Sequence, residues 1–423
     1  MKNEIKIKHV PKDAYDTLEP INSLLKIFSL TTLSRRNGRL KITYSWPKRI
    51  CAIATLIIAT ILASLIKFIK HFKDYTKNNN KIDVKFTDAL LISNFIKFVQ
   101  YIVDLHYVFK FGGHTNLKYF KLYDQIDEIL GMTYNNMIKS KVSKATVTVC
   151  LIIVVCSVLA FAAWSMFSYY AGHMVHCMDY ILFFVNTLTI IDMCANVILI
   201  EYRLKTVGDV LHDLYCAATT SLPAVNVVED RHWLYYSKDK APTSKNMRTS
   251  KCLGKIHLNN ILWLNKCYLL IIEQATYINE TFGARILINN SNQLFNIVTF
   301  ISVAIRIFSG VMFPGLSSDK KIFIITACIL IAICSSINIA WLVYRCEQSY
   351  GQRNTIIRIA DHMLVDKNIS ESMRRTLSEF RNLVDSRPVQ FTAMDFYPLS
   401  YGLVVSSASV VTTLTIILLQ GLE

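Results

Sequence analysis

The chain has 423 residues and a net charge of +16, with 52% hydrophobic and only 18% charged residues. Together with a positive mean hydropathy, this composition excludes an ordinary soluble domain and indicates an integral membrane protein. In a soluble chain the surplus of lysine and arginine would suggest nucleic-acid binding. Here it follows the orientation of membrane spans, so no nucleic-acid partner is expected.

The first 49 residues are predicted to form a cytoplasmic segment without a signal peptide. Their one apolar stretch, residues 21–30, is too short to cross a bilayer. We expect this stretch to lie along the inner leaflet as an amphipathic helix, with Leu24, Leu25, Phe28 and Leu33 facing lipid.

Seven apolar runs further along the chain are each close to the roughly twenty residues needed to cross about 30 Å of hydrocarbon. Polar side chains interrupt the second run and crowd the start of the fifth. The runs cover residues 50–66, 89–109, 145–169, 180–200, 287–308, 322–343 and 397–419. The sequence therefore predicts an all-α, polytopic membrane protein with seven transmembrane helices.

Lysine and arginine are concentrated before spans one, three, five and seven, and a lysine cluster between spans one and two is the exception. Since basic segments face the cytoplasm, the N-terminus is predicted to be cytoplasmic and the C-terminus extracellular. This orientation is the reverse of that of G-protein-coupled receptors. It counts against a metabotropic seven-helix receptor, as does the lack of an Asn-Pro-x-x-Tyr sequence in the last span.

The cytoplasmic side is predicted to carry helices of its own. Apolar residues recur at helical spacing from 253 to 288, which predicts that span five continues into the cytosol. A further helix is expected over residues 370–383, with Ser370 as its N-cap and Pro388 beyond its end. Residues 219–251 are charged and small, which is typical of a flexible insertion. The inner ends of the spans are therefore expected to pack into a helical anchor domain.

The last span carries a polar face into the membrane. The residues on this face are Ser406, Ser409, Thr413, Ile416 and Gln420. On a helix they lie within about 80° of one another. Lipid cannot satisfy a Gln and several hydroxyls, so the face should turn towards other helices or a water-filled path. From geometry alone both remain open, since small polar residues also pack membrane helices together.

The end of the chain resembles the C-terminal signature of insect gustatory receptors. In that family the last helix carries Thr-Tyr, five hydrophobic residues and Gln-Phe, and here Thr413 and Gln420 have the matching separation. Residues 391–399 (Phe-Thr-Ala-Met-Asp-Phe-Tyr-Pro-Leu) and 278–283 (Ile-Asn-Glu-Thr-Phe-Gly) strengthen the resemblance. The departures from the signature are Leu414, Thr415 and Gly421.

The resemblance implies a chemosensory receptor that is a ligand-gated, non-selective cation channel, and neither an enzyme nor a protein with a cofactor or bound metal. It implies a homotetramer, or a heteromer with related receptors, embedded in the plasma-membrane lipid of gustatory sensory neurons. One terminal helix from each subunit would line a pore for monovalent and divalent cations, with Ile416 as a hydrophobic constriction. The implied pore and gate positions are Ser409, Thr413, Ile416 and Gln420.

These expectations divide the chain into four parts. Residues 1–49 are the cytoplasmic N-terminal segment, and residues 50–345 carry spans one to six with the ligand-binding region. Residues 346–395 are the cytoplasmic anchor helices, and residues 396–423 are the pore-lining terminal helix.

A ligand pocket is expected among the outer halves of spans two to six, where aromatic rings surround a few polar groups. Aromatic residues are also common at any membrane interface. Asp192 is different, because an acid within a span is costly unless it is paired or hydrated. It could bind ligand or lock helices together. The candidates are Phe95, Trp164, Phe167, Phe184, Asn186, Asp192, Asn296, Thr299 and Thr326.

The ligand class is predicted from the balance of side chains. Phenylalanine outnumbers paired carboxylates and amides in these outer halves, which favours a bitter or lipophilic plant compound over a sugar or polyol. A protonated amine bound by Asp192 is a further alternative. A transporter or an intramembrane enzyme finds less support, because the chain lacks His-Glu-x-x-His and Gly-x-Ser-x-Gly patterns.

Overall fold

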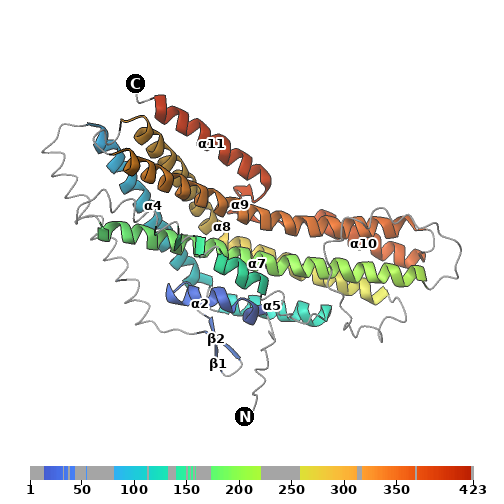
Figure 1. Ribbon diagram of the computed structural model, residues 1–423. Helices are drawn as coiled ribbons and strands as arrows, with labels where there is room; N and C mark the ends of the chain where they lie inside the picture. Colours follow the sequence, from blue (N-terminus) through green and yellow to red (C-terminus); the bar gives the residue numbers. More distant parts are fainter. Residues whose placement is uncertain are drawn as a thin grey trace, which may run out of the picture. The chain divides into compact units, whose positions relative to one another are not determined.

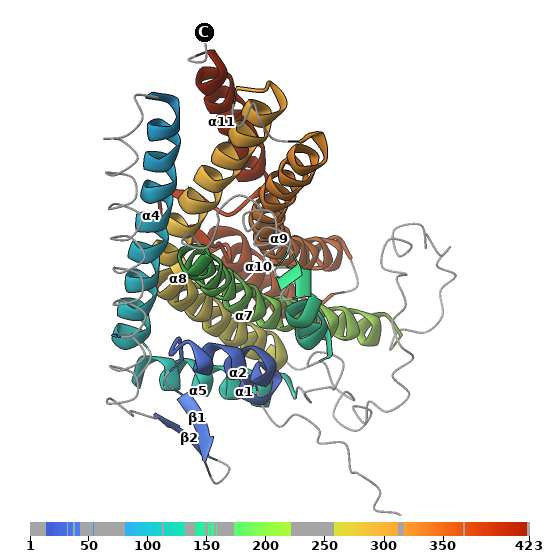
Figure 2. The ribbon, with the colours of Figure 1, turned by 60° about the vertical axis from the view of Figure 1, so that its left-hand side comes forward.

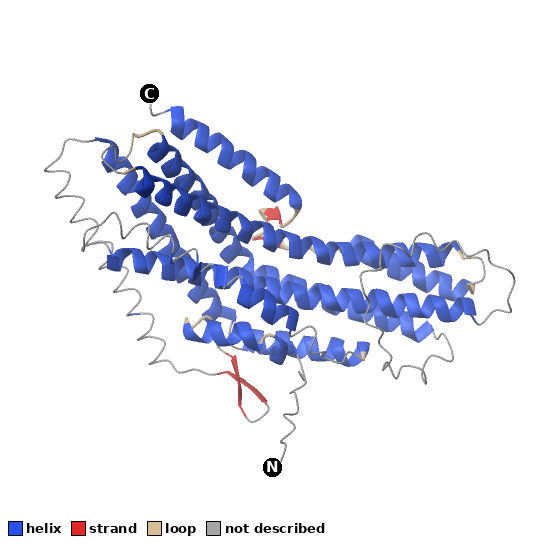
Figure 3. Cartoon of the chain, in the orientation of Figure 1, coloured by secondary structure: helices blue, strands red, loops and turns tan. Residues whose placement is uncertain are grey.

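The computed structural model is almost entirely helical over the residues that it describes (Figures 1 and 3). The larger described ranges are residues 14–31, 33–36, 39–42, 81–111, 114–131, 140–148, 173–220, 258–311, 317–366 and 369–420. Nearly all of the predicted first span and most of the third lie outside them, as does the predicted insertion from residue 221 on, since its first two residues end helix α7.

The N-terminal segment forms two short helices and a hairpin. Helix α1 (Ala14–Thr17) and helix α2 (Glu19–Ile27) precede strands β1 (Leu33–Arg36) and β2 (Arg39–Ile42), which pair antiparallel. In both views α2 lies beside α5 (Figures 1 and 2).

Helix α2 corrects one expectation from the sequence, because its apolar side packs against protein rather than lipid. Ile21 and Leu25 are 0% and 1% exposed, and the hydroxyl of Tyr15 donates a hydrogen bond to the carbonyl oxygen of Leu33 at 3.1 Å. The ring of Phe28 lies 5.7 Å from that of Phe184 on α7. The amphipathic helix is present, but its partner is the helix bundle.

Long helices make up most of the remaining structure. They are α4 (Lys81–Phe111), α5 (His114–Leu130), α7 (His173–Thr220), α8 (Leu258–Phe308), α9 (Ser318–Val365), α10 (Glu371–Ser386) and α11 (Tyr401–Gln420). Helices α7, α8 and α9 have 48, 51 and 48 residues. At about 1.5 Å per residue each is roughly twice as long as the hydrocarbon core is thick.

Membrane-spanning character is clear in three of these helices. Among the described residues, the segments long and apolar enough to cross a membrane are Leu182–Cys216, Ile261–Phe308 and Ser318–Val365, and Tyr401–Ile417 is a shorter apolar helix. The last helix starts at Tyr401 rather than at the predicted residue 397, because Tyr397 and Pro398 form a β-strand.

The described chain falls into two compact units. Unit 1 contains residues 1–200, 274–348 and 390–423, and unit 2 contains residues 201–273 and 349–389. The long helices α7, α8 and α9 therefore each contribute one end to unit 1 and the other to unit 2.

Unit 2 is a small helical domain. Helix α10 has Ser370 as its N-cap, whose side chain accepts a hydrogen bond from the backbone N–H of Met373 at 3.4 Å, as predicted. At the other end of α10, the hydroxyl of Tyr268 donates to the carbonyl oxygen of Arg387 at 2.9 Å. Phe380 and Val384 of α10 are fully buried.

Candidate functional site

Helix α11 presents its polar face away from its own bundle. Val411 packs against the cluster of Ile297, Ala332 and Ile339. The half-buried residues Leu403, Val404, Ser407, Val411 and Thr415 all lie on this side of α11. The predicted pore residues lie on the opposite side and are exposed on the protomer: Ser409, Thr413, Ile416 and Gln420.

Two hydroxyl groups of α11, those of Thr412 and Thr413, are oriented by their own helix. Thr413 donates its hydroxyl hydrogen to the carbonyl oxygen of Ser409 at 3.0 Å, and Thr412 donates to that of Ala408 at 2.9 Å. Such bonds to the preceding turn satisfy the donor within the helix. Because the hydroxyl of Thr413 uses only its hydrogen in this bond, its oxygen lone pairs remain available on the exposed side of the helix. Such lone pairs can coordinate a cation.

A short hairpin precedes α11 and rests against α8. Strands β3 (Thr392–Ala393) and β4 (Tyr397–Pro398) pair antiparallel, and the turn between them places Met394 and Asp395 at φ of 54° and 59°. The hydroxyl of Thr392 donates to the carboxylate of Asp395 at 2.9 Å, which holds the turn.

The side-chain amide of Asn279 on α8 makes two hydrogen bonds to the backbone at the start of this hairpin. Its Nδ2 donates to the carbonyl oxygen of Gln390 at 2.9 Å, and its Oδ1 accepts from the backbone N–H of Thr392 at 3.1 Å. A Cβ atom on Gly283, one turn further, would lie only 2.8 Å from the backbone nitrogen of Met394. The two motifs behind the family resemblance, residues 278–283 and 391–399, therefore contact each other.

The start of α11 is bonded to both neighbouring long helices. Asn290 of α8 donates to the hydroxyl of Tyr397 at 3.2 Å. The carboxylate of Glu347 on α9 accepts from the backbone N–H of Tyr401 at 2.9 Å, where a negative charge favours the N-terminus of a helix. A displacement of α8 or α9 would therefore act directly on α11.

A buried ion pair joins α4, α7 and α8. Nε of Arg285 donates to Oδ1 of Asp104 at 2.8 Å, and the hydroxyl of Thr189 donates to Oδ2 at 2.9 Å. A second guanidinium nitrogen of Arg285 donates to the hydroxyl oxygen of Thr189 at 3.2 Å. The side chains of Arg285 and Asp104 are 2% and 0% exposed, so each depends on the other for charge compensation.

Buried amides extend this network along α8. Nδ2 of Asn289 donates to the carbonyl oxygen of Asn186 at 2.9 Å, and Nδ2 of Asn292 donates to the side chain of Gln100 at 3.1 Å. Nε2 of Gln293 donates to Oδ1 of Asn289 at 3.3 Å. We call these residues, with the ion pair and Thr189, the polar seam. Two of the amides that crowd the start of span five, Asn289 and Asn292, thus bond α8 to α7 and to α4.

The predicted ligand-binding residues are distributed over several places. Asn186 is fully buried within the polar seam, and Asn296 and Thr299 on α8 are 1% and 9% exposed. Phe95 is 67% exposed on α4, and Thr326 is exposed on α9 with its hydroxyl bonded to its own helix. Trp164 and Phe167 lie outside the described residues.

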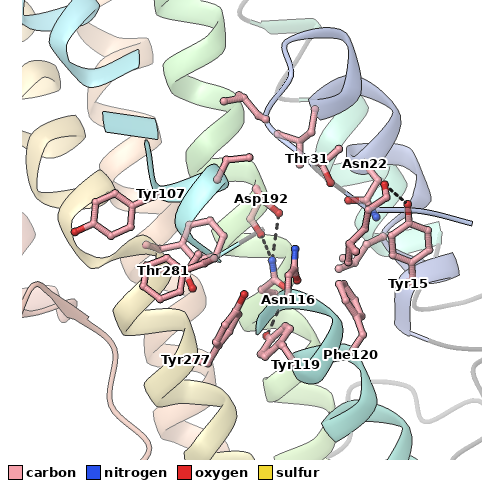
Figure 4. A pocket seen from close by; sticks show the side chains of 18 of the residues that line it. Tyr15, Asn22, Thr31, Tyr107, Asn116, Tyr119, Phe120, Asp192, Tyr277 and Thr281 are labelled. Atoms are coloured by element: carbon pink, nitrogen blue, oxygen red, sulfur yellow. Dashed lines mark hydrogen bonds between the residues drawn. The ribbon is translucent and has the colours of Figure 1, made fainter. Parts of the chain in front are cut away.

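Asp192 lies in a cavity of about 60 Å³ in unit 1, apart from the other candidates. Figure 4 shows Asp192 together with Asn116, Tyr119 and Tyr277 among the side chains that line this cavity. The walls come from the N-terminal segment and from α4, α5, α7 and α8. The sequence singles out Asp192, but it gives no indication of the wall residues, because nothing in α5 or the N-terminal segment shows that they approach this acid.

These features define a polytopic helical membrane protein with a bonded polar interior and an apolar terminal helix whose polar face is uncovered. The 7tm chemosensory receptor model matches residues 18–420, and the chain belongs to this family. It is a chemosensory receptor and not an enzyme, as the sequence predicts. No curated protein matches the chain significantly.

Two solved structures share its fold. The insect olfactory receptor OR5 from Machilis hrabei has a TM-score of 0.60 at 12% identity, covering 95% of this chain and 97% of that chain. The same receptor in complex with eugenol has a TM-score of 0.61 at 12% identity, covering 96% and 98%. The seven-helix insect receptor fold expected from the sequence is therefore confirmed.

Proposed function

We propose that the chain is a ligand-gated, non-selective cation channel in which α11 of each subunit lines a shared pore. The exposed polar face of α11 carries this proposal. A Gln and several hydroxyl groups suit neither lipid nor the protomer's own core, whereas they suit a hydrated axis between subunits. The proposed assembly is a homotetramer, or a heteromer with related receptors. The N-terminus would be cytoplasmic and the C-terminus extracellular.

The contacts at the start of α11 support a coupling route from ligand to pore. Helices α8 and α9 carry several of the proposed ligand-binding residues, and they also hold the hairpin and the first turn of α11 through Asn279, Asn290 and Glu347. A ligand that shifts α8 or α9 would turn α11 and move Ile416 away from the axis. A hydrophobic ring that widens fills with water and conducts.

The ligand would be a small tastant, most simply a bitter or lipophilic plant compound, detected in the plasma membrane of gustatory sensory neurons. The relative bound to eugenol supports a small organic ligand. The amide nitrogens of Asn289, Asn292 and Gln293 donate hydrogen bonds within the bundle, so these three donors are already used and are not available to a sugar or polyol. A response to sugars alone would overturn this choice of ligand.

The accessibility of introduced cysteines tests which side of α11 lines the pore. In the presence of agonist, a cationic thiol reagent applied from outside is expected to block current through Thr413→Cys and Ile416→Cys channels. Val411→Cys is the matched control, because Val411 packs against the subunit's own core. The native cysteines lie outside α11, so any block of the parent channel is measured first and subtracted. Equal additional block at residues 411 and 413 would contradict the assignment.

Replacement of Gln420 tests the outer end of the proposed pore. Gln420→Ala is expected to change single-channel conductance or ion preference about twofold or more while surface expression is kept, because the side chain is exposed and supports no core contact. Gln390→Ala, also exposed, is the control. Single-channel currents from membrane patches give the answer, and identical conductance in Gln420→Ala would remove this residue from the pore.

A further inference from the structure

The cavity around Asp192 is separate from both the α11 face and the other proposed ligand-binding residues. Nineteen residues line it, and Asp192 is the one sequence-predicted candidate among them. The N-terminal segment closes one side, with Asn22 of α2 among its lining residues, and α4, α5, α7 and α8 form the rest (Figure 4). The cavity has room for roughly four or five water-sized groups.

The charges at this cavity do not balance. Of the lining residues only Asp192 and Arg285 are charged. Arg285 is bonded to Asp104 at 2.8 Å, and its guanidinium lies 4.8 Å from the ring centre of Phe282. One guanidinium thus serves two carboxylates, its own partner and, at longer range, Asp192. The cavity together with the ion pair therefore carries a net negative charge.

The carboxylate of Asp192 can accept further hydrogen bonds from a ligand. Its Oδ1 accepts from Nδ2 of Asn196 at 3.2 Å. Among the described residues no other side chain donates to this carboxylate, and Asp192 is only half-buried although it lies inside the bundle. Its accessible surface therefore faces the cavity.

Aromatic rings form much of the surrounding wall. The rings of Tyr119 and Tyr277 stack with centres 4.3 Å apart, and Phe111 meets Tyr277 edge to face at 6.4 Å. Tyr107 stacks on Phe111 at 5.8 Å. Ring faces carry negative electrostatic potential and attract ammonium groups.

We propose that this cavity is a binding site for a small organic ammonium ion. The ammonium hydrogens would bond to the carboxylate of Asp192, and the alkyl part would lie against the rings of Tyr119 and Tyr277. A neutral ligand would leave the charge of Asp192 uncompensated. A divalent metal fits less well, because no group of three or more His, Cys, Asp or Glu side chains gathers in the described part of the chain.

Thermal unfolding of the purified full-length protein tests the site without any measurement of current, so its result is independent of the proposed channel function. Propylammonium chloride is expected to raise the unfolding temperature in a saturable way, since a ligand that binds only the folded state stabilises it. Equal concentrations of propan-1-ol, the neutral analogue, and of sodium chloride are expected to give no saturable rise.

Two variants identify the cavity as the place of binding. Asp192→Asn is expected to weaken propylammonium binding at least tenfold. Asn196→Lys places a tethered ammonium beside the same carboxylate and is expected to abolish binding while the protein stays folded. Asp319→Asn, at an exposed position in the first turn of α9, is the control and should bind as the parent does. No saturable rise in the parent, or unchanged binding in a folded Asp192→Asn or Asn196→Lys variant, overturns the proposal.

Discussion

Arg285→Met is expected to produce a protein that does not reach the cell surface. The substitution leaves Asp104, which is 0% exposed, as an uncompensated charge inside the bundle. Removing one partner of a buried pair costs about 3–5 kcal/mol, a large part of the roughly 5–15 kcal/mol that stabilises a typical folded protein. Surface labelling and size-exclusion profiles of the detergent-extracted protein measure the loss.

The double variant Asp104→Leu/Arg285→Met separates charge from packing. Replacing both partners of a buried pair by apolar residues is often close to neutral, so most surface expression should return. Arg374→Met is the matched control. Arg374 pairs with Glu371 at 4.0 Å, and the glutamate is 92% exposed, so little change is expected. A double variant as defective as Arg285→Met would show that the uncompensated charge of Asp104 is not the cause.

Gly283→Ala is expected to uncouple ligand binding from channel opening. The added Cβ would lie 2.8 Å from the backbone nitrogen of Met394 and 3.2 Å from its Cα. Backbone atoms cannot rotate away, and the turn at Met394 and Asp395 already has positive φ at both residues. The hairpin would have to leave α8, at a cost of about 1–3 kcal/mol. We expect ligand-evoked current to fall at least tenfold while surface expression is largely kept.

Gly351→Ala is the control for Gly283→Ala, because both glycines lie in long helices and no atom lies within 4 Å of a Cβ built on Gly351. Alanine is favoured over glycine in a helix by about 1 kcal/mol. Gly351→Ala should therefore be as stable as the parent or more so, with normal currents. Normal ligand-evoked current in Gly283→Ala would refute the role of this contact.

Periodicity and hydropathy predicted most of the helices well, including the N-cap at Ser370. Periodicity and hydropathy do not predict whether lipid or protein covers the apolar face of a helix. The apolar residues around Leu25 predict a helix that faces lipid, yet the side chain of Leu25 is only 1% exposed because it packs against protein. Lipid and a protein core demand the same side chains, so the sequence does not distinguish them. The start of α11 was also misplaced, because Tyr397 and Pro398 are apolar enough to extend the span but pair as a strand.

The site was predictable only where its residues share one element. Thr413 and Gln420 are on one helix, so their common face follows from spacing alone. Asn279 and Gln390 are 111 residues apart, and Asp104 and Arg285 are 181 apart. The sequence shows that polar side chains interrupt the second span, but it does not show that Asp104 among them pairs with Arg285. Single-sequence patterns carry no information on such distant pairs, and these pairs hold α11 and the bundle together.

Ligand-evoked current in excised membrane patches tests the central claim most directly. The chain is expressed alone or with a related receptor, and patches are exposed to alkaloids, steroids and other plant compounds in solution without nucleotides. We predict a cation current that begins on ligand addition, persists without any cytosolic factor and is lost in Gly283→Ala. A response that requires nucleotides or G proteins, or its complete absence in patches from cells that respond when intact, would contradict the account.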